Sequence, residues 1–164
     1  PNPMALEIER KFLVRGNFKT AATRHTRLSQ GYIAAGNGRT VRVRISSDRG
    51  FLTIKGPSVN GGLSRYEFET EISLADARDL LQLAVTPIID KVRWIVPVGQ
   101  HEFEVDEFLG DNAGLIVAEV ELQSETEPFE RPDWLGQEVT GQRRYYNSSL
   151  TTLPYCLWDD KPQP

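Results

Sequence analysis

The stretch EIERKF, residues 7–12, lies close to the start of the chain and carries charged side chains at alternate positions. In a β-strand, side chains two residues apart share a face, so Glu7, Glu9 and Lys11 would point one way and the residues between them the other. Two carboxylates on one face repel each other unless an opposite charge lies among them. The stretch therefore raises the question of what its charged face meets.

The overall composition is that of an ordinary globular protein. The chain has 164 residues, of which 39% are hydrophobic and 26% charged, and its net charge at pH 7 is −4. Such a charge offers no field that would attract nucleic acid or an anionic membrane. No apolar run approaches the ~18 residues of a membrane span, and the single cysteine, Cys156, cannot form an intramolecular disulfide. We therefore expect a cytoplasmic protein that binds neither nucleic acid nor membrane.

The organisation of the chain predicts one domain, residues 4–164. No repeat or shift in composition divides it, and the longest expected loops are Gly56–Gly62 and Ser124–Gly141, which are rich in turn-forming residues. The tripeptide before Met4 is typical of an expression-tag remnant. We therefore place the natural start at Met4 and leave residues 1–3 out of the fold.

Alternation of apolar and polar residues with a period of two predicts about eight strands. They are expected at residues 6–14, 28–34, 40–46, 50–56, 64–72, 88–96, 101–108 and 114–123. A short connection such as Ser46–Gly50 favours antiparallel pairing. The sequence thus predicts a mainly β protein of the α+β class, with an antiparallel sheet that is closed or strongly curved and a few helices packed outside.

Helical patterns are fewer than strand patterns. In residues 73–84, Ser73 can cap a helix and Asp76 can complete a capping box, while leucine and alanine form an apolar stripe. A second helix is expected to open near Thr140 and to stop before Pro154. Residues 16–25 form a third, less regular helical pattern.

The charged residues of the expected strands share one face. Its acidic residues are Glu7, Glu9, Glu67, Glu69, Glu71, Glu102, Glu104, Asp106, Glu119 and Glu121, and its basic residues are Lys11, Arg42, Arg44, Lys55, Arg65, Lys91 and Arg93. The opposite face is apolar, with Arg10 and Thr70 as exceptions. An amphipathic sheet with its charged face in water is one interpretation. Same-sign doublets such as Glu-x-Glu weigh against it, because neighbouring like charges repel.

Turning the charged face inward gives these side chains a use. A barrel of about eight strands is wide enough to hold one small ligand. Paired carboxylates suit Mg²⁺ or Mn²⁺, and arginine and lysine suit the oxygens of a phosphate chain. The excess of acids calls for metal cations or for protonated carboxyls. A phosphate-rich ligand carried with divalent metal would satisfy both sets of charges.

The same residues resemble a known family. EIERKF is similar to the E-x-E-x-K signature of the CYTH domain, the triphosphate tunnel metalloenzymes. It is followed in order by QGYI, VRVR, TIKG, GLSRYEFE, DKVRW, FEVDEF, VAEVEL and WLGQEVTGQRRYYNSSL. The series covers roughly residues 5–153 and looks like the small bacterial branch. The resemblance implies an eight-stranded antiparallel β-barrel that forms a tunnel.

The resemblance also implies an activity, metal-dependent hydrolysis of the terminal phosphoryl group of a triphosphate with Mg²⁺ or Mn²⁺, as two ions. The catalytic residues implied are Glu7, Glu9 and Lys11. The substrate-binding residues implied are Lys11, Arg42, Arg44, Lys55, Arg65, Lys91, Arg93 and Arg144. The metal-binding residues implied are Glu7, Glu9, Glu67, Glu69, Asp106, Glu119 and Glu121. The C-terminal helix either closes one tunnel mouth or packs on the barrel, and the residues it offers are Arg143, Arg144, Tyr145 and Asn147. Tyr32 either lines the tunnel or packs.

Several alternatives stay open. Inorganic triphosphate leads, because the inward face offers no clear aromatic pair for a nucleobase or a thiamine ring. Class IV adenylyl cyclase and thiamine triphosphatase are the other enzymes considered. A module that binds polyphosphate or nucleotide without catalysis is the candidate outside the enzymes, and the intact pair Glu7 and Glu9 argues for catalysis. A homodimer is also left open, since small members of the family are often dimers.

Overall fold

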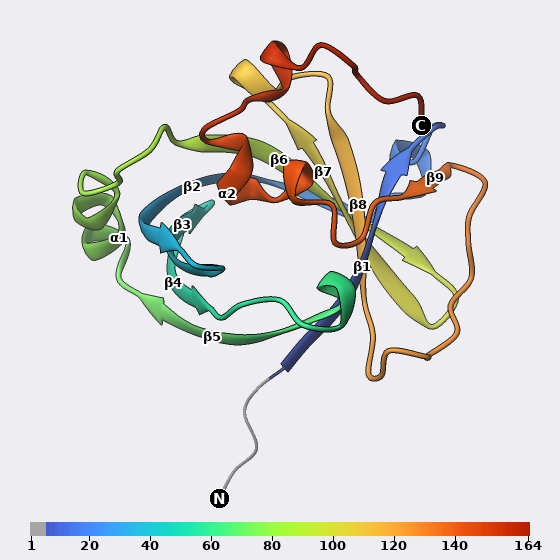
Figure 1. The fold of residues 1–164 in the computed structure, drawn as a ribbon, viewed down its shortest axis with the longest axis horizontal. Helices are drawn as coiled ribbons and strands as arrows, with labels where there is room; N and C mark the ends of the chain where they lie inside the picture. The colour runs from blue at the N-terminus through green and yellow to red at the C-terminus, as the bar shows by residue number, and fades with distance from the viewer. Residues whose placement is uncertain (1–5) are drawn as a thin grey trace, which may run out of the picture.

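The computed structural model describes residues 6–164 and contains a closed antiparallel β-barrel (Figure 1). Its strands are β1 (Leu6–Val14), β2 (Arg24–Gly36), β3 (Arg39–Ser46), β4 (Arg49–Lys55), β5 (Ser64–Ile72), β6 (Ile89–Val98), β7 (His101–Phe108) and β8 (Ile116–Glu121). They are hydrogen-bonded in the order β5-β4-β3-β2-β6-β7-β8-β1, and β1 pairs with β5 to close the barrel. The predicted barrel is confirmed. The expected tag residues 1–3 and the start at Met4 lie outside the described residues.

Strand β1 closes the barrel by pairing with a different neighbour at each end. Its first residues pair with β5, where Glu7 lies opposite Arg65. From Glu9 onward it pairs with β8, where Glu9 lies opposite Glu121 and Lys11 opposite Glu119. The E-x-E-x-K stretch therefore spans the seam of the barrel, and its side chains meet charged residues from both adjoining strands.

A ninth strand, β9 (Leu135–Glu138), was missed because its four residues, LGQE, show no alternation and lie in a stretch expected to be a loop. It pairs with β1 around Phe12 and Val14. It also explains the exceptional Arg10 on the apolar face: Arg10 donates hydrogen bonds of 2.9 and 2.6 Å from Nε and Nη2 to the Glu138 carboxylate. The outward charge is thus paired outside the barrel.

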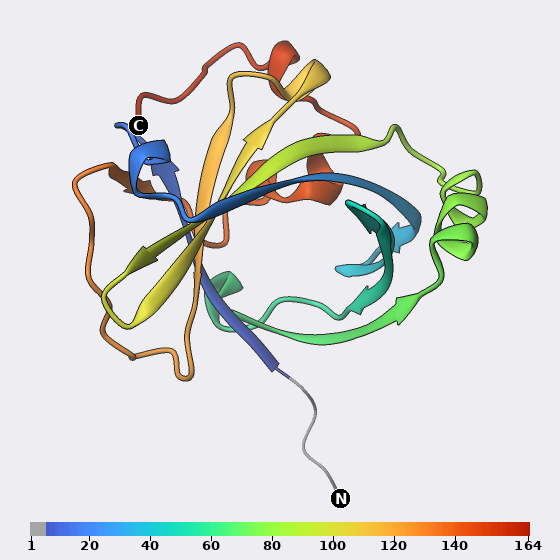
Figure 2. The same ribbon diagram turned by 180° about the vertical axis from the view of Figure 1, so that it is seen from behind.

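Helix α1 (Leu74–Leu81) confirms the expected capping, since the Ser73 hydroxyl accepts a hydrogen bond of 3.0 Å from the backbone N–H of Asp76. It packs outside β2, β3 and β4 (Figures 1 and 2). Gly50 makes this close approach possible, because a Cβ there would lie 2.6 Å from the Cβ of the buried Ala77.

The expected second helix is wrong in extent. Its stretch forms a 3₁₀ turn, η4 (Arg143–Tyr145), and a short helix, α2 (Asn147–Leu150), separated by an extended Tyr146. Gly141 has a φ of +78° and its Cα faces the backbone of Gly62, so the chain turns there and does not begin a helix. Both views show α2 within the outline of the strands (Figures 1 and 2).

The remaining short elements are 3₁₀ turns, namely η1 (Lys19–Ala21), η2 (Asn60–Gly62), η3 (Gly110–Asn112) and η5 (Tyr155–Leu157). The pattern at residues 16–25 therefore yields only η1 before β2 begins. No helix within residues 6–164 combines the length and the apolar character needed to cross a membrane.

Two apolar clusters cover different faces of the strands. The first lies outside the barrel, where Phe12, Phe103 and Val120 are fully buried under Trp134 and Leu135 from the stretch before and within β9. The second lies partly inside it. Its residues are Leu13, Ile89, Phe108, Leu115, Val117, Val139, Tyr145, Leu150 and Trp158. Since Leu13 and Val117 lie on the same face as Lys11 and Glu119, this second cluster, called the plug here, occupies part of the interior at the end of the barrel where β1 stops and β8 begins.

Candidate active site in the barrel tunnel

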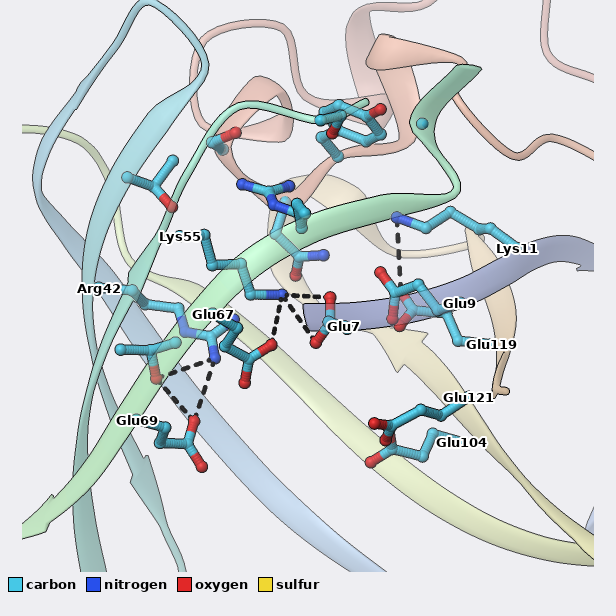
Figure 3. A pocket seen from close by; sticks show the side chains of 18 of the residues that line it. Glu7, Glu9, Lys11, Arg42, Lys55, Glu67, Glu69, Glu104, Glu119 and Glu121 are labelled. Atoms are coloured by element: carbon cyan, nitrogen blue, oxygen red, sulfur yellow. Dashed lines mark hydrogen bonds and ion pairs between the residues drawn. The ribbon is translucent and has the colours of Figure 1, made fainter. Parts of the chain in front are cut away.

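The rest of the interior is a polar cavity of about 170 Å³, called the tunnel here (Figure 3). Its walls are side chains of β1 to β8, completed by residues from the loop after β4 and from the stretch 140–148. Its carboxylates are Glu7, Glu9, Glu67, Glu69, Glu104, Glu119 and Glu121, and its cations are Lys11, Arg42, Arg44, Lys55, Arg65, Lys91 and Arg93. The two sets are equal in number. A polyanion would therefore bind only if part of the carboxylate charge were neutralised.

Most of the tunnel's cations form ion pairs with carboxylates on other strands. Lys55 Nζ lies 3.0 Å from Glu7 Oε1 and 3.5 Å from Glu67 Oε2. Arg42 and Arg44 lie on the same face of β3, and their Nη2 atoms are 3.7 and 3.6 Å from Glu69 Oε2. These pairs hold the cationic groups in place in the half-buried wall, where they point at the cavity (Figure 3).

The guanidinium of Arg44 lies in an excess of positive charge. Burial and the neighbouring Arg42 and Arg93 lower the pKa of Arg44 to about 10, so it remains protonated at neutral pH. The Nε atoms of Arg42 and Arg44 are buried without a hydrogen-bond partner. Unsatisfied donors in a cluster of like charges are the chemistry expected of a site that binds an anion.

A buried network anchors the wall formed by β6 and β7. Asp106 Oδ2 lies 2.7 Å from Lys91 Nζ, and the Asp106 carboxylate also accepts hydrogen bonds of 2.8 and 3.0 Å from Arg93. Burial alone would raise the pKa of Asp106, but Arg93 and Lys91 hold this pKa far below its usual value. Burial, only partly offset by Asp106, lowers the pKa of Lys91 to about 7. Asn147 Oδ1 accepts a further hydrogen bond of 2.9 Å from Lys91, so α2 is tied to the tunnel wall.

The carboxylates of the tunnel come in close pairs. Glu9 and Glu119 share a hydrogen bond on the adjoining strands β1 and β8. Burial and the charge of Glu119 raise the pKa of Glu9 well above its usual value, which means that Glu9 holds the shared proton. Burial opposes ionisation of Glu119 as well, but Lys11, 3.4 Å away, and the proton on Glu9 lower its pKa to about 2.

Two further pairs repeat the pattern. Burial and a hydrogen bond to Glu67 raise the pKa of Glu7. Burial and the charges of Glu7 and Glu104 raise the pKa of Glu121, and Figure 3 shows the carboxylates of Glu104 and Glu121 beside each other. Each pair carries more negative charge than its surroundings tolerate without a proton or a cation.

The donor set of these pairs fits a divalent metal ion. Within residues 6–164, no three His, Cys, Asp or Glu side chains converge as a metal cluster. The paired carboxylates nonetheless supply the hard oxygen ligands that Mg²⁺ and Mn²⁺ prefer, and a cation there would relieve the repulsion that the shared proton now relieves. Glu9, Glu119 and Glu121 are the residues best arranged for this, because they lie on adjacent strands around the same part of the tunnel.

The structure brings most of the predicted site residues together. All predicted residues on β1, β3, β4, β5, β6 and β8 line the tunnel. Asp106 does not; it is buried behind Lys91 and Arg93 as their counter-ion. Arg144 lies elsewhere, with Cζ 3.7 Å from the centre of the Trp158 ring and its guanidinium paired with Asp160. Because the expected helix is broken at Tyr146, Arg144 faces the outside of the plug.

Sequence reasoning missed several residues of the site. Glu104 lines the tunnel and pairs with Arg93 at 2.9 Å. Its place in a Glu-x-Glu doublet on the charged face could have revealed it. Tyr32, which was left open, also lines the tunnel. Tyr146 does so as well, but no local pattern predicts this, since its position depends on how the last third of the chain folds back over the barrel. Asn147, which was expected either to help close one tunnel mouth or to pack outside, also lines the tunnel.

The interior of the closed barrel carries equal numbers of carboxylates and cations. This interior is typical of proteins that hold a polyanion together with positive ions inside a tunnel. The family model described as the CYTH domain matches residues 5–155, so the chain belongs to the CYTH domain family. This family, the triphosphate tunnel metalloenzymes, implies dependence on a divalent metal.

Relatives of known name cover almost the whole chain. This chain is 44% identical over 153 residues to the inorganic triphosphatase of Acetivibrio thermocellus. The aligned residues make up 93% of this chain and 97% of that protein. This chain is 36% identical over 149 residues to the inorganic triphosphatase of Nitrosomonas europaea, covering 88% and 95%. The crystal structure of the inorganic triphosphatase NE1496 has a TM-score of 0.64 at 31% identity and covers 88% of this chain and 97% of that one.

Proposed function

We propose that this protein hydrolyses inorganic triphosphate to pyrophosphate and phosphate with the help of Mg²⁺ or Mn²⁺. The observation that carries the proposal is the tunnel itself, in which buried cations and paired carboxylates face one cavity within a closed barrel. The choice of substrate is supported by two relatives that are named inorganic triphosphatase. The match to this chain spans 97% and 95% of their lengths.

The cationic wall would bind the phosphate chain. Arg42, Arg44 and Lys55 from β3 and β4 line the cavity together with Lys91 and Arg93 from β6, so a linear polyanion beside them would receive charge-assisted hydrogen bonds from both sets. Lys11 and Arg65 add donors near the seam of the barrel. Asp106 would act as a positioning residue, because its bonds to Lys91 and Arg93 orient their donors.

The carboxylate pairs would hold the metal. Glu9, Glu119 and Glu121 are the proposed ligands of one ion, and Glu7, Glu67 and Glu69 are the proposed support for a second. A divalent ion, when bound, supplies positive charge to the phosphate oxygens and increases the acidity of water. The proton that Glu9 holds without metal would leave when the ion binds, since both compete for the same oxygens.

The reaction would be an in-line displacement in which water attacks the terminal phosphorus. A new phosphorus–oxygen bond forms, the bond to the bridging oxygen breaks, and pyrophosphate leaves with the electron pair. Glu7 and Glu9, on the same strand face, would orient the attacking water, while Lys11 beside Glu119 would balance charge at that end of the tunnel. The protein's contribution is then positioning and charge stabilisation.

The lining of the tunnel favours an inorganic substrate over a nucleotide or a thiamine ester. Among the described residues that line it, the aromatic ones are Tyr32 and Tyr146. Lys11 Nζ lies 5.1 Å from the centre of the Tyr146 ring, so one face of that ring is already used by a cation. The described lining therefore offers few aromatic surfaces on which a base or a thiamine ring could stack.

The test is phosphate release by metal-stripped protein, with and without added Mg²⁺ or Mn²⁺. Inorganic triphosphate, ATP, thiamine triphosphate and pyrophosphate are compared in parallel, and cyclic AMP is measured in the ATP reaction. We expect rapid metal-dependent release from inorganic triphosphate alone. Cyclic AMP formation, or a preference for thiamine triphosphate, would overturn the proposed substrate. Tight binding of triphosphate without turnover would mean that the tunnel is a receptor.

Two further expectations from the sequence, a cytoplasmic location and a homodimer, stay predictions.

A further inference from the structure

A second, larger cavity of about 610 Å³ adjoins the tunnel. Its walls come from three parts of the chain: the β2–β3 turn (residues 35–40), the loop after β4 with Pro57 and Ser58, and residues of the stretch 143–149 around α2. Five residues line both cavities, among them Arg65 and Tyr146. This second cavity, called the vestibule here, is therefore continuous with one end of the tunnel.

The vestibule differs from the tunnel in its charge. Its titratable lining includes Arg39, Arg65 and Arg143 but not one carboxylate among the residues that line it. In the tunnel, by contrast, every cation except Arg65 lies within 4 Å of a carboxylate. In the described part of the chain, these three arginines form no ion pair. Their positive charge is thus uncompensated, and it is concentrated at one mouth.

The walls of the vestibule are held in place by close backbone contacts. In the two-residue turn between β2 and β3, Asn37 and Gly38 have φ of 52° and 77°, and a Cβ on Gly38 would lie 3.1 Å from the Cβ of Pro57. Gly62 and Gly141 approach so closely that a Cβ on Gly62 would lie 2.4 Å from the Gly141 Cα. The shape is therefore set before any ligand arrives, which lowers the cost of binding.

Arg65 connects the two cavities. It lies opposite Glu7 at the seam between β1 and β5, and its Nε is buried without a hydrogen-bond partner. Arg39 and Arg143, in contrast, are exposed at the outer part of the vestibule. The three guanidiniums thus lead from solvent to the buried wall of the tunnel, and hydroxyl groups of Ser58 and Ser148 line both cavities and offer additional hydrogen bonds.

We propose that the vestibule is a capture site for condensed inorganic phosphate, at which the polyanion is first bound before it passes into the tunnel. This rests on the proposed function, because it assigns the entrance used by that substrate. The opposite part of the tunnel carries the more exposed carboxylates Glu69 and Glu104, which would repel an anion. A focused positive field at one mouth raises association rates of anions by about tenfold or more at low ionic strength.

The test uses the double variant Arg39→Gln/Arg143→Gln, in which both charges are lost but neither residue lines the tunnel. With inorganic triphosphate at low ionic strength, we expect kcat/KM to fall about tenfold and kcat to fall less than twofold. The difference from wild type should shrink as salt is added, because screening removes the field from the wild-type protein as well. The single variant Arg39→Gln should show a smaller change in the same direction.

The matched control is Arg24→Gln/Arg78→Gln, which removes the same charge from exposed positions on β2 and α1. An equal fall in kcat/KM in both double variants would overturn the proposal, since net charge alone would then explain it. A parallel fall of kcat and kcat/KM would also overturn it, since the arginines would then act on the chemical step.

Calorimetry separates this inference from the proposed function. Binding of inorganic triphosphate to metal-stripped protein is measured at low and high salt for wild type and both double variants. Weaker and less salt-dependent binding in Arg39→Gln/Arg143→Gln alone would support the vestibule even if the protein hydrolysed nothing. Unchanged binding and unchanged kcat/KM would overturn the vestibule and leave the triphosphatase proposal intact.

Discussion

The two parts of the barrel interior share the inward faces of β1, β6, β7 and β8 but differ in chemistry. On β1, the inward face runs from Glu7, Glu9 and Lys11 to Leu13, and on β8 it changes from Glu119 to Val117 within two residues. The charged half is a cavity whose groups pair with one another. The apolar half is filled by Tyr145, Leu150 and Trp158 from the C-terminal stretch, which includes α2.

The difference separates function from stability. Buried like charges are costly to fold unless a proton or a counter-ion is present, so the charged half stabilises the protein little until a ligand binds. The plug gains its stability from apolar burial, which needs no ligand. Asn147 stands at the border, because its side chain contacts both Lys91 and Gln30 while its helix carries Leu150. Variants of each half should therefore affect different measurements.

The largest effect is expected from the carboxylate pair of the charged half. Glu9→Gln and Glu119→Gln should each reduce kcat for inorganic triphosphate by about 10³-fold, because each removes a proposed metal ligand. Thermal unfolding of metal-free Glu9→Gln should be nearly unchanged, because a neutral amide replaces a carboxyl that already holds the shared proton. Glu119→Gln should melt at a lower temperature, because it removes the partner of the buried Lys11. Steady-state phosphate release and a melting curve check both statements.

The matched control for this prediction is Glu71→Gln. Glu71 lies on the same strand as Glu67 and Glu69, but it pairs at 2.6 Å with Arg49 and does not line the tunnel. It should keep wild-type turnover. Full activity in folded Glu9→Gln or Glu119→Gln protein would contradict the assignment of these residues to the metal.

The opposite result is expected in the plug. Leu150 is 1% exposed, and Leu150→Ala should lower the free energy of unfolding by about 3 kcal/mol through lost burial and the cavity left behind. The variant should keep most of its kcat at a temperature where it is folded, because the tunnel carboxylates are untouched. Urea denaturation followed by tryptophan fluorescence gives the first quantity, and an assay at 25 °C gives the second. A loss of activity as large as that of Glu9→Gln would show that the two halves are not separable.

An intermediate effect on both measurements is expected at the border. Asn147→Ala would leave the buried amide of Gln30 without its bond to Asn147, and Lys91 would keep Asp106 as its partner. We expect about 2 kcal/mol of lost stability, the cost of an unsatisfied buried donor, and a KM that rises more than kcat falls. The variant Asn147→Asp, which keeps an acceptor in the same place, should restore most of the stability. If neither KM nor stability changed in Asn147→Ala, the idea that Asn147 connects the tunnel to the plug would be wrong.

The smallest effect is expected outside both halves, at the pair between Arg10 and Glu138. The hydrogen bonds from Arg10 lower the pKa of Glu138 in the folded state, so the unfolded state binds the proton more readily. The pair therefore stabilises the protein above the unfolded pKa of about 4.3, and this contribution is lost as the pH falls through the folded pKa. Because both side chains are partly exposed, Glu138→Gln should cost about 0.5–1 kcal/mol at pH 7. Urea denaturation at pH 7 and pH 3 should show the difference from wild type disappearing in acid.

The sequence by itself determined the strands and the inward face, because alternation with a period of two is a local property of each strand. This is why β1, β5 and β7 were predicted with the observed bounds, and why the charged faces of seven strands meet in one tunnel. The capping of α1 by Ser73 was also local. The E-x-E-x-K order further allowed the family to be identified.

Only the tertiary structure decided where the charged interior ends and how it is reached. Strand β9 exists because β1 offers it a partner, and the expected C-terminal helix is broken because Gly141 must pass close to Gly62. These contacts join residues far apart in the chain, so no local pattern encodes them. They turn Arg144 away from the tunnel, bring Asn147 to Lys91 and place Arg143 in the lining of the vestibule together with Arg39. Local alternation sets which side chains face inward, whereas long-range packing determines which of them can meet a ligand.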